Sequence, residues 1–216
     1  MQKIVIVLIA LLSFSSANTI AQNRKTFVEG VDYYQISPLP VLKTPDAEGK
    51  VVVNYVFRYD APYCYFVDLE IMKWCANNPK VKLNRIPMSR TTNDPLTRLF
   101  ATIKNTKYEQ VIGVKTYQAI FIDDIVLNTD EDVIKWLSTQ KIDLKWYKRK
   151  SKSLLTEKRV LAYQKMKWEA PGQIYVNNQF YMDEFYYPKT TNLNVSDLLD
   201  YVIKKHVKNP SSKLSK

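Results

Sequence analysis

The chain has 216 residues, of which 46% are hydrophobic, and it carries 32 lysines and arginines against 21 acidic residues. This length suits one domain with room for an inserted subdomain, and the composition excludes a disordered or low-complexity chain. The formal net charge of +11 would attract an acidic partner, but we interpret it as the charge of a generally basic exported protein.

Residues 1–21 have the features of a secretory signal peptide. Lys3 supplies the positive start, a largely apolar run covers residues 4–14, and small residues follow, so that cleavage is expected after Ala17 or Ala21. The apolar run is too short to span a bilayer, and no later run is longer. We therefore predict an exported protein without a membrane span.

The first part of the exported chain predicts a strand, a helix and a parallel strand. A short edge strand is expected at 33–36. The segment VVVNYVF (51–57) is rich in β-branched and aromatic residues, which predicts a central strand covered on both faces. Pro62 then begins a helix with one apolar stripe, and VKLNRIPM (81–88) alternates like a strand. The crossover between the two strands should be right-handed.

The middle of the chain predicts helices. Asn93 or Asp94 caps a first helix, and Tyr117 lies at the start of a second. The segment TDED (129–132) has the pattern of a capping box before a third helix. A fourth helix with a weaker apolar phase is expected over residues 151–166.

The last part of the chain predicts strands again and then a helix. The segment QIYVNNQFYM (173–182) contains two short strand-like runs around Asn-Asn, which is typical of a type I′ hairpin. A closing helix is expected to be capped by Ser196. The order predicts an α/β fold in which residues 22–90 and 167–216 form one domain and residues 91–166 form a helical insertion.

The two cysteines, Cys64 and Cys75, fall on the same predicted helix. An even cysteine count in an exported protein suggests a disulfide. Eleven helical residues, however, span about 16 Å along the axis, and a disulfide needs Cα atoms within about 7 Å. We therefore expect two free thiols, with Cys75 in the core. With these cysteines and the single histidine, His206, the sequence predicts no metal site and no cofactor.

Five stretches, taken in order, resemble the thioredoxin fold and, more narrowly, the DsbA-like thiol:disulfide interchange proteins of the bacterial periplasm. They are FVEGVDYYQI (27–36), VVVNYVFRYDAPYCYFVDLE (51–70), VKLNRIPM (81–88), DEDVIKWLSTQKID (130–143) and WEAPGQIYVNNQFY (168–181). The resemblance implies a thioredoxin-like fold with an inserted helical subdomain, a periplasmic location, unfolded or cysteine-containing polypeptides as clients, and a Dsb-type redox partner.

The resemblance also assigns the residues of the redox motif. Family members carry Cys-Pro-His-Cys, or a variant of it, at the first turn of the helix. Pro62 and Cys64 match the proline and the second, resolving cysteine, and Tyr63 takes the variable position. Ala61 occupies the position of the nucleophilic cysteine, and alanine has no group that can attack or hold sulfur. Dithiol oxidase turnover should therefore be absent.

Three further positions follow from the same resemblance. Pro171 matches the cis-proline of the family, with Ala170 before it, in a loop that faces the motif and binds client backbone. Asp68 matches an acidic position that helps to move protons in active members. Tyr55 stands where active members often carry a buried glutamate.

Three functions remain open on the sequence, and we favour the first. The chain can be a non-enzymatic polypeptide-binding or chaperone-like protein that uses the groove beside Pro171. It can instead be a one-cysteine exchange protein, if the small Ala61 exposes Cys64 and the helix start stabilises its thiolate; otherwise Cys64 is a buried thiol. The basic segment KWYKRKSKSLL (145–155) would suit a polyanion or nucleic acid, but we interpret it as an exposed helix end and expect no nucleic-acid partner.

Overall fold

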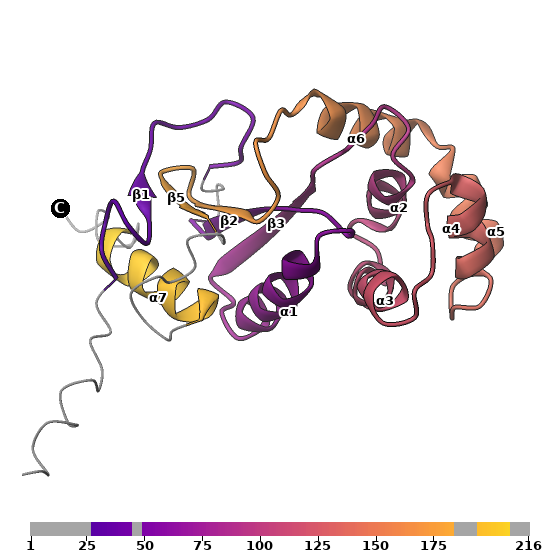
Figure 1. Ribbon diagram of the computed structural model, residues 1–216. Coiled ribbons are helices and arrows are strands. Elements are labelled where there is room, and N and C mark those ends of the chain that lie inside the picture. The colour runs from indigo at the N-terminus through magenta and orange to yellow at the C-terminus, as the bar shows by residue number, and fades with distance from the viewer. Residues whose placement is uncertain (1–26, 45–48, 184–193, 208–216) are drawn as a thin grey trace, which may run out of the picture.

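The computed structural model of the chain describes residues 27–44, 49–183 and 194–207, so the expected signal peptide lies outside the described residues. These residues form five strands and seven helices (Figure 1). The strands are β1 (Tyr34–Gln35), β2 (Val51–Phe57), β3 (Val81–Pro87), β4 (Gln173–Val176) and β5 (Phe180–Asp183). The helices are α1 (Pro62–Ala76), α2 (Pro95–Ile103), α3 (Glu109–Phe121), α4 (Asp130–Leu137), α5 (Leu144–Ser151), α6 (Leu154–Lys165) and α7 (Val195–His206).

The strands form one mixed sheet in the order β1-β5-β4-β2-β3. Strand β2 lies parallel to β3 and antiparallel to β4, and all its residues after Val51 are buried. The predicted central strand and the strand–helix–strand unit are thus confirmed. The hairpin between β4 and β5 is confirmed as well, because Asn177 and Asn178 have φ values of 50° and 56°, which a type I′ turn requires.

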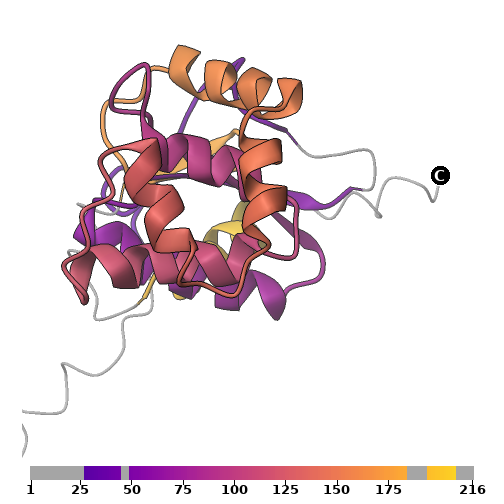
Figure 2. The same cartoon turned by 90° about the vertical axis from the view of Figure 1, so that its right-hand side faces the viewer.

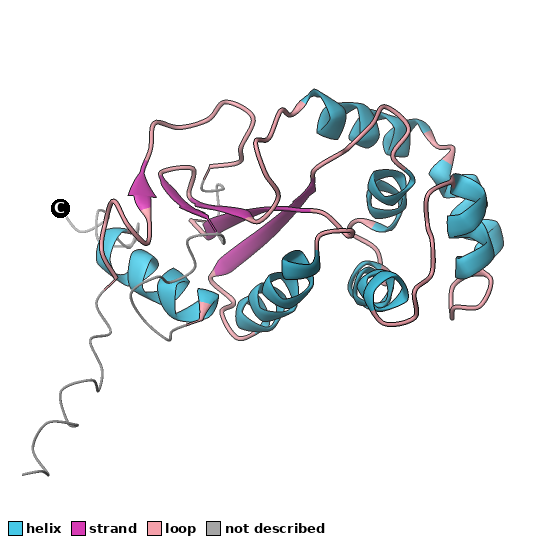
Figure 3. Cartoon of the chain, viewed as in Figure 1, coloured by secondary structure: helices cyan, strands magenta, loops and turns pink. Residues whose placement is uncertain are grey.

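Helices α1 and α7 pack together on one face of the sheet (Figures 1 and 3). The other helices gather beside the sheet, where α2 contacts α3, α4, α5 and α6 (Figure 2). The hydrophobic core accordingly has two parts, one around the sheet with α1 and α7, and one within the helical group. The described residues therefore have the expected α/β architecture with a helical insertion; the domain boundaries at 90 and 167 stay a prediction.

One prediction for the helical insertion is wrong. Tyr117 lies near the end of α3, which begins at Glu109. The start of this helix has no side-chain cap, so no capping pattern marks it in the sequence. The helix expected over residues 151–166 is confirmed as α6, which begins at Leu154, and a separate helix, α5, ends at Ser151. Ser153 interrupts them because its side chain accepts a hydrogen bond from the Thr156 amide and caps α6.

The cap predicted for the closing helix is also wrong. Asn194 caps α7 in a capping box with Asp197. Ser196 lies inside the first turn, where its amide and hydroxyl both donate to Glu70 Oε1 of α1, at 2.8 and 2.9 Å. Ser196 therefore fastens α7 to the helix that carries the motif. The predicted capping box of α4 is confirmed, with Thr129 as the cap.

Candidate functional site

The motif lies at the start of α1, directly after the loop that leaves the carboxyl end of β2. Ala61 is the N-cap residue, with extended backbone and no side-chain acceptor for the helix, and Pro62 is the first helical residue. The Cys64 amide donates to the Ala61 carbonyl at 3.0 Å, which closes the first turn. The four motif residues therefore have the helix-start position that the resemblance implies.

Cys64 is fully buried, with an exposed fraction of 0%. Its side chain belongs to the core cluster around the sheet, and the Tyr55 hydroxyl donates to its carbonyl at 3.4 Å. Ala61 is itself buried and does not open a path to the sulfur. The structure therefore agrees with the interpretation of Cys64 as a buried thiol, and not with its exposure by the small Ala61.

Cys75 lies near the other end of α1 and is partly buried, so its predicted place in the core is only partly met. Burial raises the pKa of its thiol to about 12, so Cys75 remains protonated at neutral pH. Neither cysteine forms a disulfide, as expected. Neither thiol provides the exposed thiolate on which disulfide exchange depends.

The loop of Ala170 and Pro171 lies, like the motif, at the carboxyl end of β2. The Gly172 amide donates to the Val56 carbonyl at 2.7 Å, which holds the loop at the carboxyl end of β2. The predicted cis peptide is wrong, because the described residues contain no cis peptide bond. A trans bond is the lower-energy form before proline, and Gly172, with φ of 92°, makes the turn into β4. Pro171 is buried and Ala170 is partly exposed.

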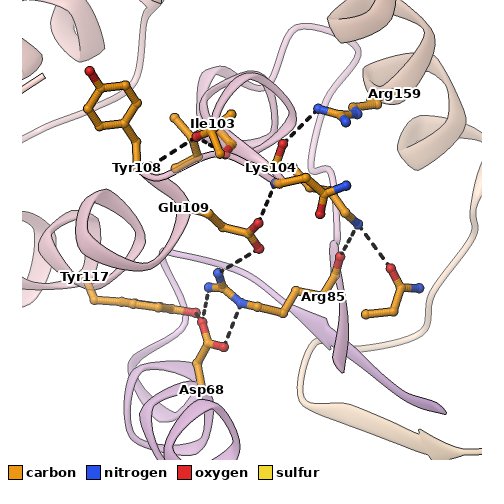
Figure 4. Close-up of polar contacts among 11 residues, drawn as sticks. Asp68, Arg85, Ile103, Lys104, Tyr108, Glu109, Tyr117 and Arg159 are labelled. Atoms are coloured by element: carbon orange, nitrogen blue, oxygen red, sulfur yellow. Dashed lines mark hydrogen bonds and ion pairs between the residues drawn. The ribbon is translucent and has the colours of Figure 1, made fainter. Parts of the chain in front are cut away.

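Asp68 lies one turn after Cys64 and forms a buried ion pair that the sequence did not predict (Figure 4). Arg85 of β3 holds the carboxylate with two nitrogens, and its Nε donates to Oδ1 at 2.9 Å. The Tyr117 hydroxyl of α3 donates to Oδ2 at 3.2 Å. Arg85 also lies 3.7 Å from the Glu109 carboxylate of α3. The cluster therefore joins α1, the sheet and the insertion.

The electrostatics of this pair follow from its burial. Desolvation raises the pKa of Asp68 above its ordinary value, and the charge of Arg85 acts in the opposite direction. Desolvation lowers the pKa of the Arg85 guanidinium, but the neighbouring Asp68, Tyr59 and Tyr117 together raise it above its ordinary value. Because every Asp68 oxygen has a donor, the carboxylate is bound rather than free for proton transfer.

A second, partly buried cation strengthens the contact between the insertion and the sheet. Lys104, at the end of α2, donates to Asn84 Oδ1 at 3.1 Å and to the Arg85 carbonyl at 2.9 Å (Figure 4). Burial lowers the pKa of this lysine to about 8. Arg159 of α6 donates to the Lys104 carbonyl at 3.2 Å. These bonds fix the helices against the strand that carries Arg85.

The outer side of the motif carries an apolar surface that the sequence reasoning missed. Phe66 is 69% exposed, Pro62 is exposed, and Tyr63 is partly exposed. Their spacing of three and four residues puts them on one face of α1, and we call them the aromatic surface. One sequence signal could have found this surface: Phe66 is aromatic but falls outside the apolar stripe of the predicted helix. A hollow of about 230 Å³ adjoins the motif, lined by Arg58, Tyr59, Asp60, Pro87, Met88, Arg90, Asp94, Leu96 and Thr97.

Within the part of the chain that the structure describes, no group of three or more histidine, cysteine or acidic residues is arranged to hold a metal ion.

None of the helices in the described ranges combines the length and the apolar character needed to cross a membrane.

Comparison with known proteins gives one consistent likeness. No family model matches the sequence. Two curated relatives, the thiol:disulfide interchange proteins DsbA of two Pseudomonas aeruginosa strains, are 25% identical over 141 residues, which cover 64% of this chain. The chain spans 65% of the length of these relatives.

The likeness in structure covers more of the chain. This chain superposes on a crystal structure of P. aeruginosa DsbA with a TM-score of 0.66 and 20% identity, over 82% of this chain and 91% of that one. For the oxidoreductase DsbA of Xylella fastidiosa the TM-score is 0.64 at 19% identity, over 83% and 96% of the two chains. Both comparisons show the DsbA-like thioredoxin fold.

Proposed function

We propose that this DsbA-like chain, which has the thioredoxin-type fold of the thiol:disulfide interchange proteins, binds unfolded polypeptide in the periplasm without oxidising it. One observation carries the proposal: Ala61 stands at the nucleophile position, and Cys64 beneath it is fully buried. A dithiol oxidase needs two sulfurs that pair with each other and a thiolate that a client can reach. The described site offers neither.

Surfaces suited to binding polypeptide remain near the motif, although the motif lacks the nucleophilic cysteine. The aromatic surface offers exposed apolar side chains beside the motif, and such patches on a protein typically mark an interaction site. The loop of Ala170 and Pro171 leads directly into β4. The resemblance implies that client backbone binds at this loop. Extended polypeptide binds such loops by main-chain hydrogen bonds, with side-chain pockets adding selectivity. These features support a holder of unfolded chains.

The export signal of residues 1–21 and the resemblance to DsbA-like proteins support the periplasm as the location. The same resemblance supports cysteine-containing polypeptides as clients and a Dsb-type protein as a partner. The proposed location and the proposed clients do not depend on redox activity, because a client can be held without being oxidised.

The test is suppression of aggregation. We expect the mature chain to reduce light scattering by thermally unfolded citrate synthase, and Phe66→Ser to weaken this effect by about fivefold or more, because it removes an exposed aromatic anchor. Val111→Ser provides a matched control, since Val111 is also an exposed apolar helix residue but belongs to α3. Equal suppression by both variants would show that the aromatic surface does not hold the client.

A second function, one-cysteine exchange through Cys64, is favoured by one feature only. Cys64 lies in the first turn of α1, where the helix end favours a thiolate. Against it stands the complete burial of the side chain.

Labelling of the native protein decides between the two functions. With glutathione disulfide, we expect Cys64 to react on the order of 100-fold more slowly in buffer than in denaturing urea, because the sulfur becomes reachable only when the structure opens. Mass spectrometry after digestion measures the adduct at Cys64 and, as an internal comparison, at Cys75. A DTT-sensitive adduct that forms at Cys64 in the native state at the rate seen in urea would establish the exchange function instead.

A further inference from the structure

Helix α6 presents an apolar face to solvent. Three leucines lie on it, Leu154, Leu155 and Leu161, and they are 71%, 59% and 52% exposed. With Ala162 and two lysines they occupy positions that repeat every three or four residues, so they form one stripe along the helix. The opposite face carries the buried residues of α6. The apolar stripe is therefore additional to the face that α6 buries against the fold.

The charges within this stripe are of one sign. Lys158 and Lys165 lie within it, and no acidic residue does. Glu157, the acidic residue of α6, forms an ion pair with Arg98 of α2. Exposed basic residues surround both ends of the stripe: Lys148, Arg149, Lys150 and Lys152 before it, and Lys167 after it. Three of these form the last turn of α5, as expected for the basic segment.

The position of α6 leaves the stripe accessible. The helix forms the outer edge of the helical insertion, on the side away from α3, in both views (Figures 1 and 2). The stripe thus lies on an outer helix of the insertion, with exposed basic residues in the chain on both sides of it.

From this arrangement we infer that α6, together with the basic end of α5, binds peripherally to a membrane surface rich in anionic phospholipid. Exposed leucines on a convex helix can each enter the boundary between headgroups and acyl chains, and the surrounding lysines then meet the phosphates. Lysine and arginine clusters gain attraction from an anionic surface within a Debye length. The inference does not depend on the proposed polypeptide-binding function, which uses α1.

Anionic lipid fits these observations better than the other partners that a basic surface attracts. A nucleic acid would use the lysines but would leave the three leucines in water. An acidic protein would need a concave partner face shaped to the helix, whereas a fluid lipid surface adapts to a rod. Exposed leucines beside exposed lysines are the composition expected of a helix that binds at a membrane interface.

The experiment is co-sedimentation of the full exported chain with vesicles of phosphatidylglycerol and phosphatidylethanolamine, compared with phosphatidylcholine vesicles. We expect binding to the anionic vesicles to be about tenfold or more tighter than to the neutral ones. The triple variant L154S/L155S/L161S and the triple variant K148Q/R149Q/K150Q should each weaken it by about tenfold or more. The control V111S/I122S/V126S, which removes three exposed apolar residues at and after α3, should bind like the wild type. Circular dichroism melting verifies that each variant is folded.

Four results would overturn the inference. The first is an absence of binding to anionic vesicles, and the second is equal binding to neutral ones. The third is a leucine variant that binds anionic vesicles as tightly as the wild type while the charge variant does not, because this would define a polyanion-binding surface without insertion. A loss of binding in the control variant as large as in the leucine variant would equally count against α6.

Discussion

Replacing Asp68 by alanine should lower the free energy of unfolding by about 3–5 kcal/mol, because the substitution removes the bidentate partner of the buried Arg85 guanidinium and leaves that charge to the more distant Glu109 carboxylate, 3.7 Å away. Arg85 is 4% exposed and Asp68 is 0% exposed, so water cannot take the place of the lost carboxylate. Tyr117 would lose its acceptor in the same step. Urea denaturation measured by circular dichroism gives this free energy directly.

A double-mutant cycle separates the pair from the cavity that each substitution leaves. Arg85→Met should also be strongly destabilising, because it leaves the buried carboxylate without its cation. The double variant with Asp68→Leu should recover much of the loss, since it buries two apolar side chains and no charge. A coupling energy below about 1 kcal/mol would contradict this account.

The ion pair of Arg58 and Asp60 provides the matched control. It has a similar bidentate geometry, with an Nη2–Oδ2 distance of 2.6 Å, but both side chains are more than a fifth exposed. Exposed pairs contribute roughly 0–1 kcal/mol, so Asp60→Ala should cost far less than Asp68→Ala. Equal costs would show that burial does not determine the strength of the Asp68 pair.

This cluster also changes the interpretation of Asp68. The resemblance assigned it to proton movement, but its oxygens are bound by Arg85 and Tyr117. We therefore propose that Asp68 holds the helix of the motif against β3 and α3. A structural pair of this kind has no need of a nearby nucleophile, which agrees with alanine at residue 61.

Local patterns in the sequence predicted much of the fold. The run VVVNYVF could only be a buried strand, Asn-Asn between two strand-like runs required positive φ, and TDED supplied both partners of a capping box. Each of these signals acts over a few residues. The order of the elements was enough to suggest the thioredoxin-like arrangement, which the comparisons with DsbA structures confirm.

The remaining features depend on contacts between distant residues, which one sequence does not reveal. Arg85 lies in a strand-like run that assigned it no partner, yet it meets Asp68 seventeen positions earlier. The burial of Cys64 depends on side chains of the sheet and α3. The cis peptide before Pro171 was inferred from the family pattern alone, and the described residues contain no cis peptide bond.

Ala61→Cys should create a dithiol that forms an intramolecular disulfide with Cys64. The two residues are separated by one helical turn, which the hydrogen bond from the Cys64 amide to the Ala61 carbonyl closes at 3.0 Å. Residues three apart in a helix have Cα atoms about 5 Å apart, within the range that a disulfide spans. Incubation with glutathione disulfide should therefore give a product that lacks two hydrogens, as detected by mass spectrometry.

The oxidised variant should also oxidise a client peptide that contains two cysteines. A client thiolate attacks the sulfur introduced by Ala61→Cys, the bond from that sulfur to Cys64 breaks, and the second client thiolate then releases the oxidised peptide and the reduced protein. Glutathione disulfide restores the protein disulfide. With the start of α1 stabilising the introduced thiolate, we expect a rate about 100-fold or more above that of the wild type.

Two controls make this result informative about the rest of the site. Ala61→Ser keeps the size of the new side chain but has no sulfur, so it should remain inactive. Ala61→Cys combined with Cys64→Ala has one thiol at the motif and cannot form the protein disulfide, so it can act only through its glutathione adduct and should oxidise the client more slowly than the dithiol variant. Turnover by the dithiol variant would assign the missing activity to residue 61 alone. A disulfide that forms without turnover would assign it instead to what the client meets, the loop of Ala170 and Pro171, or to Tyr55 beneath the motif.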